Sequence, residues 1–140
     1  MKLMMTVLIL FVLLVLAAMA YVRFTPVADT AAGPRPAAAL PGDYPSAGGF
    51  YAVRTLAELP EDVLVKLDQV IMNGPRVMRR SGGPDNLPMI YETRSRLWAF
   101  PDINTVWVED GNLHLYANLV YGKSDLGANR ARILGWLERL

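Results

Sequence analysis

The last third of the chain carries the side chains best suited to bind a ligand. Arg94, Lys123 and Arg130 are basic, and Ser124 lies where the last helix is expected to begin. Free backbone N–H groups at a helix start, with arginines beside them, bind anions because both supply positively polarised donors. These four residues are therefore the candidate site for a small anion or a lipid headgroup.

A structural role is the alternative for the basic residues. The predicted folded part has eleven Lys/Arg and eleven Asp/Glu, a balance that favours ion pairs. The arginines would then pair with Glu92, Asp102 and Asp125 and lock the last helix against a sheet. Gly127 and Asn129 form helices poorly, so we expect them to serve close packing or a local hydrogen bond. The candidate structural motif comprises Asp102, Asp125, Gly127, Asn129 and Arg132.

Catalysis has weaker support in the sequence. Asp102 and Asp125 could act as the acid and base of a hydrolase, but a carboxylate in the first turn of a helix is expected for capping alone. His114 is the only histidine and the chain has no cysteine, so neither a thiolate nor a second imidazole can complete a metal site. We expect a protein that is not an enzyme and that uses no metal or cofactor.

Nucleotide and nucleic-acid binding are disfavoured. The sequence Gly122-Lys123-Ser124 matches the end of a phosphate-binding P-loop, but that pattern needs a glycine at position 117, where this chain has alanine. The net charge is only +1, whereas nucleic-acid binders need a surplus of basic residues to neutralise phosphates. We therefore expect neither kind of ligand.

The elements that position these residues begin with an apolar segment. Residues 3–22 contain no charged side chain and have Thr6 as their only polar one. A helix of this length spans a bilayer core of roughly 30 Å. We expect residues 1–23 to be a single-pass anchor in the inner membrane, with the N-terminus in the cytoplasm and the domain in the periplasm. The alternative is a signal peptide cleaved after Ala20, because residues 18–20 have the small-x-small form.

Residues 24–49 are rich in proline, alanine and glycine. Proline favours extended backbone, and the stretch has few large apolar groups with which to repay the entropy of ordering. It is predicted to be a semi-extended tether between the anchor and a domain at residues 50–140.

The sequence pattern of residues 50–140 predicts an α+β domain. Patterns typical of strands occupy residues 50–56, 76–80, 89–95, 103–109 and 113–121, and helical spacing occupies the segment from Pro60 to Asn73 and the segment from Ser124 to the C-terminus. We expect a loop at residues 81–86 and irregular chain at 96–102, because Pro101 interrupts strand pairing. The order β-α-β-β-β-β-α predicts a five-stranded antiparallel sheet with both helices on one face.

A hairpin closes around Asp110-Gly111, because glycine supplies the positive φ of a tight turn. In that register Val108 faces Leu113 and Val106 faces Leu115, on the side that the helices cover. Trp107 then faces His114 and Thr105 faces Tyr116 on the other side. If that second face is bare, the three residues Trp107, His114 and Tyr116 form a candidate interface.

Three segments carry a resemblance to a known family: Thr93-Arg-Ser-Arg96, Phe100-Pro-Asp102 and the stretch from Tyr121 to Arg132. From about Gly49 to Leu140 the chain resembles the domain of unknown function 1499 family. The resemblance implies an apolar N-terminal helix followed by one small domain, in a bacterial envelope. Relatives have a segment rich in serine and arginine where this chain has Ala117-Asn-Leu-Val120.

These observations predict a membrane-anchored, non-catalytic interaction module. Its expected partners are the lipid bilayer, through residues 3–22, and a membrane protein whose complex it would serve as an accessory. The alternative function is binding of a small anionic ligand or lipid headgroup at the start of the last helix. A short connection to the anchor would keep the domain near the bilayer in either case.

Overall fold

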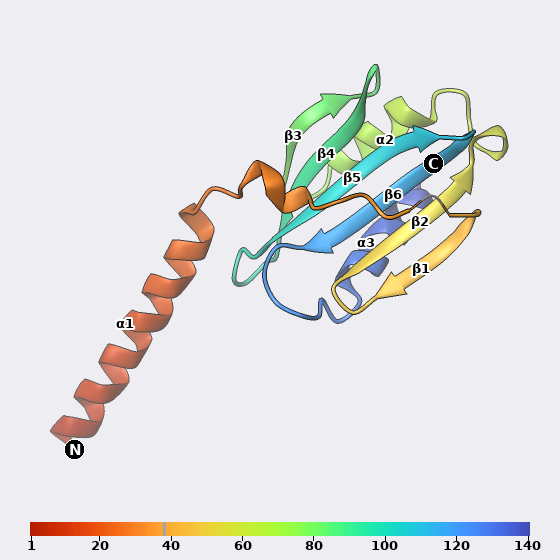
Figure 1. Cartoon of the computed structure of the whole chain (residues 1–140). Helices are drawn as coiled ribbons and strands as arrows, with labels where there is room; N and C mark the ends of the chain where they lie inside the picture. The colour runs from red at the N-terminus through yellow and green to blue at the C-terminus, as the bar shows by residue number, and fades with distance from the viewer. Residues whose placement is uncertain (38) are drawn as a thin grey trace.

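The computed structural model describes residues 1–37 and 39–140 and shows a projecting helix followed by one α+β domain (Figure 1). The domain contains one antiparallel sheet in the strand order β1-β2-β6-β5-β4-β3. Its strands are β1 (Gly42–Ser46), β2 (Gly49–Thr55), β3 (Val77–Gly83), β4 (Asn86–Arg94), β5 (Pro101–Glu109) and β6 (Asn112–Leu119). The helices are α1 (Lys2–Phe24), α2 (Val63–Met72) and α3 (Ala128–Leu137), with short 3-10 turns η1 (Asp29–Ala32) and η2 (Leu56–Glu58).

Helix α1 has apolar side chains on every side and buries none of them against the protein. A helix that is hydrophobic all round needs an apolar environment, which is supplied either by a protein core or by a membrane. Its 23 residues are long and apolar enough to span a bilayer, and no other helix in the described ranges meets that test.

The sheet has six strands, so the prediction of five was wrong. The additional strand, β1, comes from the stretch predicted to be a tether, and it pairs with β2 along the edge of the sheet. A tight turn at Ala47-Gly48 joins the two strands, and β2 begins at Gly49. A Cβ atom there would lie 2.4 Å from the carbonyl oxygen of Ala117, so only glycine allows β2 to approach β6 at this point.

Two further strand boundaries differ from the prediction. The segment 81–86 is mostly strand, because β3 and β4 form a long hairpin whose register shifts accommodate its glycines. Pro101 does not interrupt the ladder but begins β5, where it pairs with Arg94. Proline is tolerated at the first residue of a strand because the missing N–H falls at the end of the ladder.

The predicted β5–β6 hairpin is confirmed residue by residue. Val108 pairs with Leu113, Val106 with Leu115, Trp107 with His114 and Thr105 with Tyr116. The helix-covered face forms the main core, in which buried residues of α2 and α3 pack on the sheet: Val63, Leu67, Ile71, Ile133 and Trp136 against Met89, Tyr91, Val106, Leu113 and Leu115.

The second face of the sheet is covered by the chain's own connector, described for residues 25–37 and 39–41, which crosses it between α1 and β1 (Figure 1). Val27 is buried, Arg35 lies 5.6 Å from the ring centre of Trp107, and Ala39 packs beside the same cluster. Asn118 donates from Nδ2 to the carbonyl oxygen of Ala31 at 3.3 Å. The connector is therefore packed on the domain and is not the free spacer that its composition predicts.

The candidate interface at Trp107, His114 and Tyr116 depended on a bare second face, and the connector covers that face. Trp107 and His114 are only 2% and 1% exposed, and Tyr116 is half-buried. Nδ1 of His114 lies 2.7 Å from the hydroxyl of Tyr51, and its ring stacks on Trp107 at 4.8 Å. These aromatic residues form a second, smaller core under the connector.

Candidate functional site

A buried carboxylate on β4 organises the junction between α1 and the domain. Glu92 is 2% exposed, and each of its oxygens accepts from a different arginine. Nη1 of Arg80 lies 2.8 Å from Oε2, and Nε of Arg94 lies 2.6 Å from Oε1. We call Arg80, Glu92 and Arg94 the helix-end cluster.

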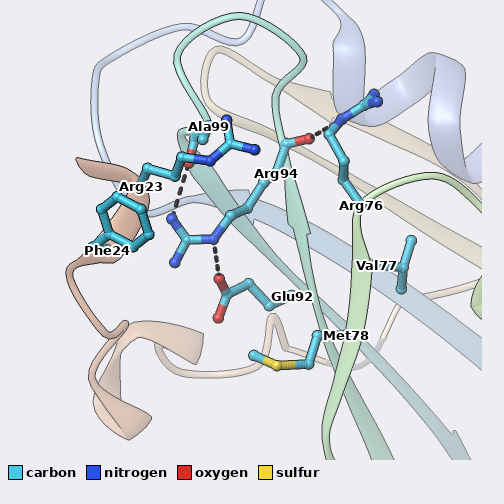
Figure 2. A pocket seen from close by; sticks show the side chains of 8 residues that line it. All are labelled: Arg23, Phe24, Arg76, Val77, Met78, Glu92, Arg94 and Ala99. Atoms are coloured by element: carbon cyan, nitrogen blue, oxygen red, sulfur yellow. Dashed lines mark hydrogen bonds and ion pairs between the residues drawn. The ribbon is translucent and has the colours of Figure 1, made fainter. Parts of the chain in front are cut away.

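Arg94 joins this cluster to the last turn of α1. Its Nη1 donates to the carbonyl oxygen of Val22 at 2.9 Å and to that of Ala99 at 3.1 Å, and its Nη2 donates to Thr25 at 3.4 Å. The last carbonyl groups of a helix have no partner within the helix and carry partial negative charge. A guanidinium therefore stabilises this helix end, and Figure 2 shows Arg94 between Glu92 and the end of α1.

Arg80 holds the next part of the connector. Its Nη2 donates to the carbonyl oxygen of Val27 and to Oδ1 of Asp29, both at 2.8 Å. The hydrogen bond that Arg80 donates to Asp29 raises the pKa of Arg80, against the opposing effect of burial. Since Asp29 is fully exposed, the contact with the buried Glu92 is the stronger constraint. Two arginines thus attach two points of the connector to one buried carboxylate.

A pocket of about 340 Å³ lies beside this cluster, between the end of α1 and strands β3 and β4. Arg23 and Phe24 of α1 line it from one side, and Arg76, Met78 and Arg94 line it from the other (Figure 2). Most of the N–H groups of Arg94 are already engaged by Glu92 and by carbonyl oxygens. Arg94 therefore serves here to hold the end of α1 against strand β4.

A second polar cluster lies on the opposite, helix-covered face. Nη2 of Arg132 lies 3.0 Å from Oδ2 of Asp102, and Nη1 of Arg132 donates to Oδ1 of Asn129. Asn104 donates from Nδ2 to Oγ1 of Thr93 at 3.1 Å. Burial raises the pKa of Asp102, and the nearby Arg132 partly offsets this effect. The cluster joins α3 to strands β4 and β5, as the structural alternative predicted for Arg132 and Asp102.

Asp125 caps α3, which begins at Ala128 and not at the predicted Ser124-Asp125. Its Oδ1 accepts from the N–H of Gly127 at 3.0 Å, and its Oδ2 accepts from the N–H of Asn129 at 2.8 Å. Gly127 adopts a φ of 82° just before the helix, a conformation that glycine adopts without strain. The chain's own carboxylate therefore occupies the place where an external anion was predicted to bind.

The four predicted anion-binding residues are divided between the two faces of the sheet. Arg94 contacts the end of α1 on the connector face, whereas Ser124 lies in the loop before α3 and Arg130 lies in the first turn of α3. Ser124 accepts from the N–H of Leu126 at 3.3 Å. Lys123 and Arg130 are exposed, and neither forms an ion pair with the residues that the structure describes.

Both candidate catalytic carboxylates are engaged in contacts that hold α3. Asp102 pairs with Arg132, and Asp125 accepts two backbone N–H groups at the helix start. Each is thus fixed by groups that would have to be displaced before it could move a proton to or from a substrate. No group of three or more His, Cys, Asp or Glu side chains with metal-binding geometry occurs among the described residues.

Sequence reasoning missed a basic pocket of about 280 Å³ between β3, β4 and α3, which we call the arginine pocket. Its lining residues include no Asp or Glu and four arginines, Arg76, Arg94, Arg132 and Arg139, of which Arg94 directs its guanidinium to Glu92 and α1 on the other face of the sheet. Arg76 is held at φ 56°, an uncommon conformation for a residue other than glycine. Nε of Arg76 donates to the carbonyl oxygen of Arg94 at 3.0 Å. In return, the backbone N–H of Arg94 donates to the carbonyl oxygen of Arg76 at 3.1 Å.

Comparison with known proteins agrees with the motif residues. A family model described as "Protein of unknown function (DUF1499)" matches residues 39–140. No curated protein and no solved structure matches the chain. The motif stretches quoted for the resemblance supply Arg94 to the helix-end cluster, and they supply Thr93, Asp102, Asn129 and Arg132 to the cluster under α3.

Proposed function

The chain belongs to this family of unknown function, and on that premise we propose that it is a membrane-anchored, non-catalytic interaction module. In this proposal α1 remains in the inner membrane as a single span, with its N-terminus in the cytoplasm and the domain in the periplasm. The module serves a membrane protein complex as an accessory. The sequence contributes Lys2 before the apolar run and Arg23 after it, and a domain of this size crosses with an N-terminal anchor largely regardless of charge.

The observation that carries the proposal is the attachment of the domain to the end of an apolar helix. Arg94 binds carbonyl oxygens of Val22 and Thr25, and Arg80 binds Val27. The connector then covers one face of the sheet. The contacted residues Val22, Thr25 and Val27 follow Ala20, so these contacts fix the domain to the residues that end the apolar run. The length and hydropathy of α1 support its retention as an anchor.

The proposal predicts that the full-length chain, tagged at its C-terminus, leaves native membranes in mild detergent with a stoichiometric membrane protein. The purified chain should keep residues 1–20 by intact mass. Because the chain has no cysteine, an exposed Glu58→Cys variant can report topology. Its thiol should react with an impermeant maleimide from the periplasmic side. Recovery of the chain alone would contradict the accessory role, and a mass lacking residues 1–20 would contradict the anchor.

The arginine pocket supports a second candidate function, which is binding of an anion such as inorganic phosphate or a phosphate-bearing lipid headgroup. Its lining contains no Asp or Glu, and Arg76 and Arg139 are the lining arginines that form no ion pair within the described residues. Arg139 is exposed, lines this pocket and donates through Nε to the carbonyl oxygen of Gly135 at 2.8 Å. It forms no ion pair within the described residues.

Calorimetry with inorganic phosphate and with glycerol phosphate tests this candidate. Loss of one charged hydrogen bond, worth about 1.5–3 kcal/mol, should weaken binding about tenfold or more in Arg139→Gln. Arg130→Gln is the matched control, because Arg130 is an exposed arginine of α3 outside the pocket, whereas Arg139 follows the end of α3 and lines the pocket. Equal affinity in the two variants, or no binding heat with either probe, would remove the arginine pocket as a ligand site.

A further inference from the structure

Large apolar side chains lie exposed on two connections of the domain. Leu97, Trp98 and Phe100 lie between β4 and β5, and their exposed fractions are 67%, 37% and 38%. Tyr121 and Leu126 lie between β6 and α3, and they are 45% and 96% exposed. Such a group of exposed apolar residues marks a contact with a partner or a membrane.

The two connections form one surface. The rings of Trp98 and Phe100 stack with their centres 6.1 Å apart, and the centre of Phe100 lies 6.4 Å from that of Tyr121. The register of β5 and β6 agrees, because Asp102 at the start of β5 pairs with Leu119 at the end of β6. We call Leu97, Trp98, Phe100, Tyr121 and Leu126 the loop patch.

The loop patch lies next to the end of α1. One nitrogen of Arg94, Nη1, donates both to Val22 in the last turn of α1 and to Ala99 within the β4–β5 connection. Figure 1 shows both connections at the end of the sheet from which α1 projects. If α1 spans the bilayer, the patch is therefore at the level where the span meets the headgroups.

The charges around the loop patch are basic. Arg23, Arg96 and Lys123 are exposed, and within the part of the chain that the structure describes none of them forms an ion pair. Asp125 is the acidic residue of these connections, and its carboxylate accepts the N–H groups at the start of α3. A surface of this sign complements anionic headgroups.

We propose that the loop patch docks in the interfacial layer of the same bilayer that α1 spans. The inference rests on the proposed anchor. The aromatic rings and leucines enter among the headgroups, where Trp and Tyr side chains are enriched because they combine an apolar body with a polar tip. Arg23, Arg96 and Lys123 contact anionic headgroups at the edge of the patch. The domain is then attached to the membrane surface by the β4–β5 and β6–α3 connections as well as by α1.

Site-directed spin labelling of the full-length chain tests this inference, since the chain contains no cysteine. Single-cysteine variants Leu97→Cys and Leu126→Cys probe the loop patch. Leu10→Cys in α1 reports insertion of the helix. Glu58→Cys is the control at the other end of the sheet, because η2 contacts the β5–β6 turn through the hydrogen bond from Leu56 to Gly111. Each protein is reconstituted in vesicles of phosphatidylcholine with phosphatidylglycerol.

The expected result is that the labels at residues 97 and 126 collide more with oxygen than with a water-soluble nickel chelate, as the label at residue 10 does, while the label at residue 58 shows the reverse. Chelate accessibility at residues 97 and 126 equal to that at residue 58, with residue 10 buried in lipid, would overturn the docking while leaving the anchor intact. After such a result, the loop patch would be assigned to contact with a protein partner. A chelate-accessible label at residue 10 would instead overturn the anchor itself.

A separate experiment tests the basic residues at the edge of the loop patch, Arg23, Arg96 and Lys123, which we call the basic rim. The double variant Arg96→Glu with Lys123→Glu, carried in the Leu97→Cys chain, should shift the label toward water in vesicles that contain phosphatidylglycerol. In vesicles of phosphatidylcholine alone the shift should be smaller, because the attraction to anionic headgroups is already absent. Equal shifts in both lipids would contradict the role of the basic rim.

Discussion

Glu92→Gln should lower the free energy of unfolding of the domain by about 2–3 kcal/mol, which is below the range for removing one partner of a fully buried ion pair. The reduction reflects the arginine side chains, which are 18% and 20% exposed and keep some access to water. The variant leaves Arg80 and Arg94 without their shared carboxylate, while both remain confined at the junction. The connector should consequently become more sensitive to proteolysis between residues 25 and 41.

Urea denaturation in detergent micelles can measure this change, with fluorescence of the buried Trp107 and Trp136 as the readout. Glu138→Gln is the matched control, because it removes an exposed carboxylate near the C-terminus. If both variants unfold at the same urea concentration as the unmodified chain, Glu92 does not organise the junction.

Arg132→Met should cost about 3 kcal/mol at neutral pH, because it leaves the buried carboxylate of Asp102 without its cationic partner. Asp102 is 6% exposed, so water can replace little of the lost interaction. The exposed Arg130→Met on the same helix is the control and should change stability by less than about 0.5 kcal/mol.

The cost of Arg132→Met should depend on pH. Burial raises the pKa of Asp102 above its ordinary value of 3.8, and loss of the lowering effect of Arg132 raises it further. When a carboxyl group has a higher pKa in the folded state, folding favours its protonated form, so stability increases as the pH falls through that pKa toward 3.8. The difference between the variant and the unmodified chain should therefore shrink in acid.

The denaturation midpoints of the Arg132→Met variant and of the unmodified chain, measured from pH 7 to acidic pH, check this dependence. Asp102→Asn combined with Arg132→Met should recover much of the loss at neutral pH, since it removes the unpaired charge. A loss that stays constant with pH, and that the double variant does not relieve, would assign the effect to packing of the Arg132 side chain alone.

Local pattern was enough to predict the elements whose periodicity is strong. The Asp110-Gly111 turn set the β5–β6 register, and helical spacing identified α2 and the buried face of α3. The apolar run of α1 was equally clear. In these segments the residues that decide the structure are close in the sequence.

The missed features depend on contacts between distant residues. Strand β1 contains Pro45 and exposed side chains, so its pattern is weak and its order comes from pairing with β2. The connector is ordered by Arg80 and Arg94, which bind Val27 and Thr25 and lie more than fifty residues away from them. Its proline content alone predicts an open spacer, because composition contains no information on such long-range hydrogen bonds.

The candidate site was predicted in part for the same reason. The pairing of Arg132 with Asp102 followed from balanced charge, and capping by Asp125 followed from its position near a helix start. The grouping of Arg94, Lys123, Ser124 and Arg130 failed because strand alternation turns Arg94 away from α3. Arg76 gave no signal in the sequence, because its positive φ is set by its reciprocal bonds with Arg94.

The domain is fixed to the end of the apolar helix α1 by Arg80 and Arg94. A pair of spin labels tests this attachment most directly, one at Tyr21→Cys in α1 and one at Asp85→Cys in the exposed turn between β3 and β4. Pulsed dipolar measurements on the full-length protein in nanodiscs should give a narrow distance distribution that broadens in Glu92→Gln. A distribution equally broad in both proteins, as a free tether would produce, would contradict the account.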